Sequence, residues 1–525
     1  MRERHAFSFP AVPRSIGRSR TTDWLPTGVA SGIVARTRGL LAGIALLALL
    51  TWQAVAFAAD PYVADPAFPW QGFNANAFGV PLTGPNQSNA GRKVAKLADG
   101  KLVVASLVKK LDGSQANGLW NLGLTRYDPE TGLALPWSNR DAAYSGIKPW
   151  DIVYPNTAAA GYNWIQSVKV LDGHILVAVN RQFSGSDVDV YVLVFGEDGS
   201  FQSSTGIFTT SAAEHVGGMD AYQTLTSVGV QIVRTNTVVV AATKLGSPSR
   251  PLFKRLELNA NGSLTDKTGV VALNTHYCAD TTRDCEPAGV ALGVQLLQST
   301  SPYIYVLNRV FESGIGYFTV TRVNANGTAD ASWSGQRIYG IGDASLWAEA
   351  IAVRPGFQND EIFVASERKL SCRNGIEVDR LDQHGENTSW ASVGGSDSSN
   401  PTFCLLLSRS YPNALAIDGD RLALAGFDAT SPLLLGEENV DAALSILDIR
   451  GDALKLQNKQ VFSYADDERL AHSGAWDVLP TGRGRFVLAG DGRHFASEID
   501  GSAGKTFSFL LGVRPDRLFG DGFDP

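Results

Sequence analysis

The sequence predicts an all-β protein, namely a seven-bladed β-propeller built from four-stranded repeats of about 60 residues. Two features of the composition favour this class: Gly is abundant at 54 of 525 residues, and charged residues make up only 18%. The third and strongest observation is a hairpin pattern that recurs seven times. Few segments have the apolar spacing of an amphipathic helix.

The first half of each unit is a hairpin of two apolar strands. In residues 94–105 the strands flank Asp99-Gly100, and Asp-Gly between apolar strands is a strong hairpin signal. In the third copy we expect the turn at Thr235-Asn236. Successive turns lie about 60–70 residues apart, as expected for one supersecondary unit per repeat. The other copies span residues 168–178, 228–241, 290–307, 350–365, 414–426 and 476–490.

The second half of each unit is a strand that ends in an Asx-Gly turn. The clearest copy runs from Val320 to Asp330 and contains Asn324-Ala-Asn326-Gly327. Asn and Asp side chains cap such turns, and Gly supplies the positive φ. A calcium loop is the alternative, but it needs six to eight oxygen ligands and usually a closing carboxylate. No Glu follows at that spacing, so turn chemistry is favoured.

The combined pattern V-x-x-x-x-D-G-K-[IL]-V-V-A followed by R-[YL]-[ND]-x-[ND]-G-[ST]-x-D resembles the delta-60 repeat family, whose members resemble β-propellers. Copies at 94–132, 290–333 and 350–385 match it well, and the resemblance covers most of residues 60–525. Its motifs are turns and core strands. The resemblance therefore implies a fold and carries over no catalytic residue.

The two ends of the repeat region are expected to close a ring. Asp65-Pro-Ala-Phe68 resembles the tail that follows each second-half turn. We therefore expect residues 60 to about 90 to add the outer strand to the last blade. A linear solenoid is the alternative, but it would need polar capping units, which we do not find.

Residues 1–58 have the features of a secretory signal peptide with an over-extended N-terminus. Arg36 and Arg38 precede the apolar stretch 40–50, and Ala56-Phe-Ala58 forms a cleavage site. An uncleaved membrane anchor is the alternative, but the apolar run is short for a span. The mature chain, residues 59–525, would then be a single exported propeller, either periplasmic or secreted, with no membrane span.

Four cysteines suit an oxidising compartment. We expect two local disulfides, Cys278–Cys285 and Cys372–Cys404. A zinc site is the rival interpretation, but there is no C-x-x-C, and His276 is the only nearby His.

The charge balance excludes one class of partner. Without the seven Arg and two acidic residues of 1–58, the chain has 38 basic and 50 acidic residues, a net charge of −12. Such a surface repels phosphate backbones, so we expect no binding to nucleic acid.

The sequence marks no catalytic residue, cofactor-binding residue or metal ligand. His215, His472 and His494 could face the ring opening, whereas His174 is expected on a surface turn. Trp side chains, including Trp164 and Trp476, are expected mainly between blades, with stacking on sugar rings as the alternative.

The leading hypothesis is a monomeric, non-enzymatic propeller that binds a protein, peptide or carbohydrate through loops on one ring face. The alternative is an enzyme, such as a lyase, hydrolase or quinone-dependent dehydrogenase, with its site at the central channel. Fold alone cannot choose between them. Convergence of His, Arg and carboxylates at the channel mouth would favour the enzyme, and an exposed aromatic patch would favour binding.

Overall fold

The computed structural model places residues 59–525 in one compact unit. The predicted signal peptide lies outside the residues that the structure describes. These are residues 62–68, 73–76, 89–108, 120–141, 149–154, 161–184, 187–208, 212–228, 231–273, 278–280, 282–293, 301–324, 326–331, 333, 345–356, 360–370, 373–382, 384–393, 410–429, 440–462, 471–494 and 506–515.

These described residues contain strands and turns but no helix, so the predicted all-β class is confirmed. The strands form seven antiparallel sheets, numbered here along the chain. Sheet 1 contains β3 (Asn89–Lys96), β4 (Leu102–Val108), β5 (Asn121–Tyr127) and β6 (Asp151–Tyr154). Sheet 2 contains β7 (Gly161–Leu171), β8 (His174–Ser184), β9 (Asp187–Gly196) and β10 (Phe201–Gly206). Sheet 3 contains β11 (Glu214–Val228), β12 (Gln231–Lys244), β13 (Arg250–Leu258), β14 (Leu264–Asp266) and β15 (Val271–Ala272).

The remaining sheets repeat the pattern. Sheet 4 contains β16 (Asp284–Leu292), β17 (Ile304–Glu312) and β18 (Ile315–Val323). Sheet 5 contains β19 (Ser345–Arg354), β20 (Glu361–Leu370), β21 (Arg373–Leu381) and β22 (Asn387–Val393). Sheet 6 contains β23 (Ser410–Asp418), β24 (Arg421–Ala429), β25 (Val440–Asp448) and β26 (Lys455–Phe462). Sheet 7 contains β27 (Ala471–Gly482), β28 (Arg485–His494) and β29 (Thr506–Pro515), with β1 (Tyr62–Ala64) and β2 (Phe73–Asn76) at its edge.

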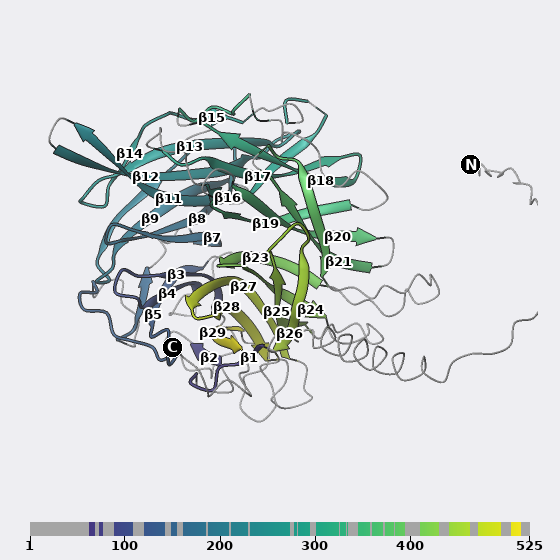
Figure 1. Cartoon of the computed structure of the whole chain (residues 1–525). Helices are drawn as coiled ribbons and strands as arrows, with labels where there is room; N and C mark the ends of the chain where they lie inside the picture. The colour runs from purple at the N-terminus through teal and green to yellow at the C-terminus, as the bar shows by residue number, and fades with distance from the viewer. Residues whose placement is uncertain are drawn as a thin grey trace, which may run out of the picture. The chain divides into compact units, whose positions relative to one another are not determined.

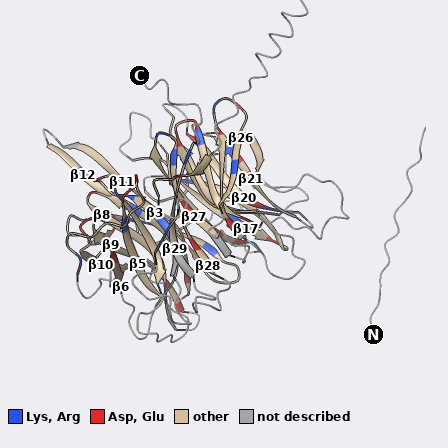
Figure 2. Cartoon of the chain, turned by 90° about the horizontal axis from the view of Figure 1, so that it is seen from below, with Lys and Arg blue, Asp and Glu red and all other residues tan. Residues whose placement is uncertain are grey.

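The predicted hairpins form the first two strands of each sheet, with one correction. The third hairpin does not turn at Thr235-Asn236. Instead β11 and β12 remain paired as far as Val228 with Gln231, and Asn236 lies within β12 opposite Gln223. Asn236 donates to Asp172 of the neighbouring sheet at 2.7 Å, so its amide serves an inter-sheet contact rather than a turn. Figure 2 shows the resulting long β11–β12 pair reaching beyond the neighbouring strands.

The first strands of the sheets, β3, β7, β11, β16, β19, β23 and β27, surround one axis. Each contacts the first strand of the next sheet, and β27 contacts β3. Figure 1 shows the purple-blue β3 beside the yellow-green β27 and β28. The apolar cores lie between successive sheets, as in the cluster that joins Val103 of sheet 1 to Ile175 of sheet 2. Four-stranded sheets repeated around an axis constitute a propeller-like fold.

At two junctions an aromatic side chain of one sheet packs on a turn glycine of the next. The aromatic ring of Trp137 packs on the Gly199 turn of sheet 2, so closely that a Cβ on Gly199 would lie 3.0 Å from the Trp137 side chain. Phe68, which follows β1, makes the same contact with the Gly132 turn of sheet 1, where a Cβ would lie 2.2 Å from the ring. Because Gly132 has φ +64° and faces this ring, only glycine suits the position.

The N-terminal segment completes sheet 7. Strands β1 and β2 both pair antiparallel with β29, whose residues lie more than 400 positions later. Asp65, which is 2% exposed, accepts a hydrogen bond from the Ala67 N–H at 3.0 Å and pairs with Arg485 at 2.6 Å. Arg485 also pairs with Glu130 of sheet 1. Residues from both ends of the chain therefore bridge sheets 7 and 1.

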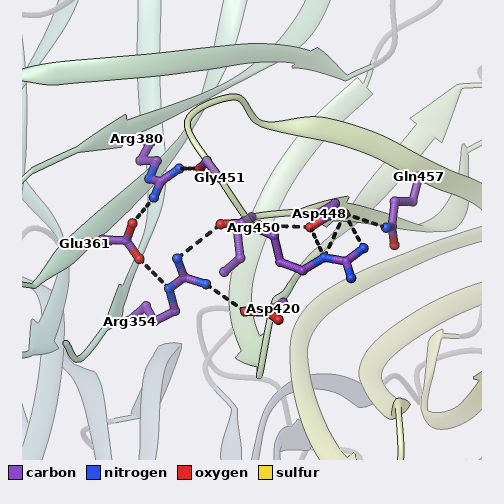
Figure 3. A network of polar contacts seen from close by, with 9 residues as sticks. Arg354, Glu361, Arg380, Asp420, Asp448, Arg450, Gly451 and Gln457 are labelled. Atoms are coloured by element: carbon purple, nitrogen blue, oxygen red, sulfur yellow. Dashed lines mark hydrogen bonds and ion pairs between the residues drawn. The ribbon is translucent and has the colours of Figure 1, made fainter. Parts of the chain in front are cut away.

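Ion pairs add a second link between sheets at the turns, as Figure 3 shows for sheets 5 and 6. Glu361 pairs with both Arg354 and Arg380 of its own sheet. Arg354 reaches across to Asp420 at 3.2 Å and donates to the Ile449 carbonyl at 3.1 Å. Arg380, which belongs to the second-half motif, donates to the Gly451 carbonyl, so both arginines join strands of sheet 5 to turns of sheet 6.

One of the two predicted disulfides, Cys278–Cys285, is present. Cys372 and Cys404 lie outside the described residues. Residues 334–344, which follow the last described strand of sheet 4, also lie outside the described residues. The described part of sheet 4 has three strands. Among the described residues, none belongs to a helix of the length and apolarity needed to cross a membrane.

Candidate functional site

A β-bulge occurs at an equivalent place in every first strand. At each of these places the antiparallel register skips one residue, which has no partner on the second strand. Bulges re-aim a side chain and are common beside active sites. We call the skipped residues the bulge ring: Arg92, Gln166, Gly217, Ala288, Glu349, Asn413 and Trp476.

The bulge ring lies at a cavity of about 330 Å³, called here the mouth cavity. All of its residues except Gly217 line this cavity. The second strands and neighbouring first-strand residues complete the wall, notably Trp164, Asn180, His215, Glu286 and Arg309. The cavity is therefore made by side chains from many sheets, at equivalent positions of the repeat.

A second cavity of about 260 Å³, the axial cavity, is lined by all seven first strands. The two cavities share part of their lining, which comprises Lys93, Gln166, Ala288, Glu349 and Asn413. The bulge ring consequently lies where one cavity meets the other.

Two amide side chains are held between first strands in this shared layer. Gln166 donates to the carbonyl of Gly217 in the next sheet at 3.2 Å, and to that of Ala288, two sheets away, at 3.3 Å. These contacts are possible because the bulge residues of those two sheets are the small ones. Asn413 donates to the Ala475 carbonyl at 2.8 Å. Both amides thus have fixed positions.

Two Trp rings and an arginine form one wall of the mouth cavity. The Arg92 guanidinium lies 4.0 Å from the centre of the Trp476 ring and 5.1 Å from that of Trp164. The two rings meet edge-on at 6.0 Å. Trp476 donates its indole N–H to Asp491, and Trp164 donates to Gln166 at 2.6 Å. The cation–π contacts and indole hydrogen bonds hold this wall rigid.

The opposite wall carries charge. Arg309 donates to the Ala348 carbonyl at 2.7 Å and pairs with Glu349. Burial raises the pKa of Glu286, and this effect exceeds the opposing attraction of Arg309. Glu286 therefore holds a proton more readily than a free carboxylate does. On the side of the Trp rings, Lys93, which follows Arg92 in β3, donates to the Trp476 carbonyl at 3.1 Å.

Buried charges also face the axial cavity. Lys169 pairs with Asp220 at 3.1 Å, and Asp477 accepts a hydrogen bond from the Val94 N–H at 2.9 Å. Burial lowers the pKa of Lys93 and raises that of Asp477. For Lys169, the pKa-lowering effect of burial is outweighed by Asp220, and the net change is a rise.

The structure agrees with the expectation for His215 and contradicts the one for His174. His215 lines the mouth cavity, whereas His472 and His494 lie in β27 and β28 and their side chains fall outside the described part. The prediction for His174 was wrong, because its side chain is 6% exposed and packs inside sheet 2. Within the described part of the chain, no group of three His, Cys, Asp or Glu could hold a metal ion.

The expectation for Trp was correct for some residues only. Trp137 and Trp333 are buried in the cores, as expected, but Trp164 and Trp476 line the mouth cavity. Sequence reasoning also missed Arg92, Glu286, Arg309 and Glu349. A usable signal existed, since the bulge residues of these strands lie at, or one or two positions before, the starts of the apolar stretches at 94, 168, 350, 414 and 476.

No family model and no curated protein matches this chain. It is similar to a protein of unknown function from Dyadobacter fermentans, with 8% identity and a TM-score of 0.38 over 85% of this chain and 99% of that one. It is also similar to Drosophila Semaphorin 2a, with 9% identity and a TM-score of 0.40 over 86% of this chain and 76% of that one.

A further similarity is to a GH43 endo-arabinanase from Bacillus licheniformis, with 11% identity and a TM-score of 0.28 over 55% of this chain and 95% of that one. All three TM-scores are below 0.5, so these likenesses carry no argument about function. The propeller-like fold follows from this chain's own strand pairing and contacts.

Proposed function

We propose that residues 59–525 form one closed, exported, seven-bladed propeller of the delta-60 type that binds a small polar ligand of the carbohydrate class in its mouth cavity. The observation that carries this proposal is the convergence of two Trp rings, fixed amides and charged groups on one cavity. Ring closure is supported by the contact of β27 with β3. Export is supported by the Cys278–Cys285 disulfide.

The size of the mouth cavity favours a small ligand over a folded protein. Its volume of about 330 Å³ lies at the lower end of the range for small-molecule sites, about 300–1,000 Å³. Sugars present apolar C–H faces and many hydroxyls. Trp164 and Trp476 offer ring surface for the apolar sugar faces, whereas Asn180 and Glu286 offer polar groups for the hydroxyls. The ligand would thus enter the ring axis, rather than lie across exposed loops.

Trp476→Ala is expected to weaken saccharide binding about 10- to 100-fold, because it removes ring surface and releases Arg92 and Asp491 from their contacts. Screening the full chain on a glycan array, followed by calorimetry with the best ligand, measures the change. Trp390→Ala is the matched control, since Trp390 is 55% exposed and does not line the mouth cavity. Equal losses in the two variants, or no saccharide binding by the parent chain, would contradict the proposal.

A hydrolase is the second candidate, and Glu286 is the observation that favours it. A carboxyl with a raised pKa is what a general acid needs near neutral pH. If the bound saccharide is cleaved, Glu286→Gln should lower the rate of reducing-end release about 100-fold or more while binding persists. If no reducing ends appear over hours with the parent chain, the binding function alone stands.

A further inference from the structure

Arg92 is a cation of the mouth cavity with two donor nitrogens that have no acceptor in the described part of the chain. Its Nε and Nη1 are buried and have no hydrogen-bond partner. A buried charged donor without an acceptor is costly, and a bound water, ion or ligand is one way to supply the acceptor. Among the described arginines, Arg92 is the one with two such nitrogens. The flanking Trp rings contact the guanidinium face and leave hydrogen bonding to its edge.

The other cations of this cavity already have acceptors. Arg309 is hydrogen-bonded to the Ala348 carbonyl and paired with Glu349, and Lys93 is bonded to the Trp476 carbonyl. Their charge and donors are therefore largely committed to the protein. A ligand that enters the cavity meets Arg92 as the available strong donor.

The nearest counter-charge does not satisfy Arg92. Asp491 attracts it electrostatically, but among the described residues no carboxylate forms an ion pair with Arg92. Asp491 instead accepts the indole N–H of Trp476. Burial raises the pKa of Asp491, which disfavours the negative charge that would balance Arg92. The guanidinium thus carries positive charge that the chain does not fully balance.

We propose that the ligand is an acidic saccharide, whose carboxylate Arg92 binds within the mouth cavity; this inference rests on the proposed function and names the class of its ligand. A charge-assisted hydrogen bond between guanidinium and carboxylate is about twice as strong as a neutral one. A uronic acid combines this carboxylate with the apolar sugar face that the Trp164 and Trp476 rings can contact, and a phosphate lacks such a face, so the uronic acid suits the site better.

The test compares matched saccharides that differ only in a carboxylate. Calorimetry on the full chain uses the monosaccharides galacturonate against galactose and glucuronate against glucose, with inorganic phosphate as a third arm. We expect the acidic member of at least one pair to bind ten times more tightly or better. Arg92→Gln should reduce the acidic ligand's affinity to that of its neutral partner, and Arg92→Lys should restore part of the preference.

Each other outcome decides against the proposal in a distinct way. Equal affinity for the acidic and neutral members overturns the acidic class while the carbohydrate function stands. Binding of phosphate alone, lost in Arg92→Gln, overturns the saccharide and identifies a simple oxyanion site. Binding of no probe overturns both the acidic class and the carbohydrate function. Circular dichroism and the thermal midpoint confirm that the Arg92 variants are folded.

Discussion

Phe68→Ala is expected to lower the free energy of unfolding by about 3–5 kcal/mol, the range for deletion of a buried aromatic ring. Phe68 is 3% exposed and packs with Val104 of sheet 1 and Leu510 of sheet 7. Its ring lies against Gly132 and Gly512, which have no side chains that could fill the space it leaves. The variant should therefore weaken the junction that closes the ring.

Urea unfolding followed by circular dichroism measures this effect, with Leu133→Ala as the control. Leu133 lies next to Gly132 but is 54% exposed, so its truncation should change stability by less than about 0.5 kcal/mol. A propeller loses cooperativity when its ring opens, and the unfolding transition of Phe68→Ala should broaden or split. If both variants unfold like the parent chain, the N-terminal segment does not close the ring.

The second large effect concerns the pH dependence of stability. Burial, reinforced by the nearby Glu377, raises the pKa of Asp379 to about 7. Asp379 is 2% exposed, and Asn387 donates to only one of its carboxylate oxygens, at 2.7 Å. An unfolded Asp has a pKa near 3.9, so between about pH 4 and pH 7 the native state binds the proton that the unfolded state has lost.

Stability should therefore fall as the pH rises through this window, by up to about 4 kcal/mol from this group, and level off above pH 7. Asp379→Asn replaces the carboxyl with a neutral group of the same shape and should remove most of that fall. Urea midpoints at pH 5 and pH 8 test this. The variant is expected to be more stable than the parent at pH 8 and similar at pH 5, and a lower midpoint at pH 8 would refute it.

The turns show what short-range sequence could predict. The expected turn glycines Gly100, Gly173, Gly327 and Gly419 all have positive φ. Such a turn depends on a few adjacent residues, because a positive φ is open to Gly and costs most other residues energy. The third hairpin was misplaced because Thr and Asn suit both a turn and a polar strand, and there the contact of Asn236 with Asp172 decides between them.

The site shows what sequence could not predict. Arg92 and Trp476 lie 384 positions apart in the chain, and they meet because β3 and β27 are neighbours around the axis. A bulge is a property of the register between two paired strands, so no single strand's sequence specifies it.

The sequence by itself therefore determined the repeat, its hairpins and most of its turns, since these depend on local backbone preferences and on period-two burial. Tertiary structure decided which seven residues form the bulge ring, which cation keeps two donor nitrogens without an acceptor, and how Phe68 joins the first and last sheets. Those features depend on contacts between residues far apart in the chain, and local preferences carry no information about them.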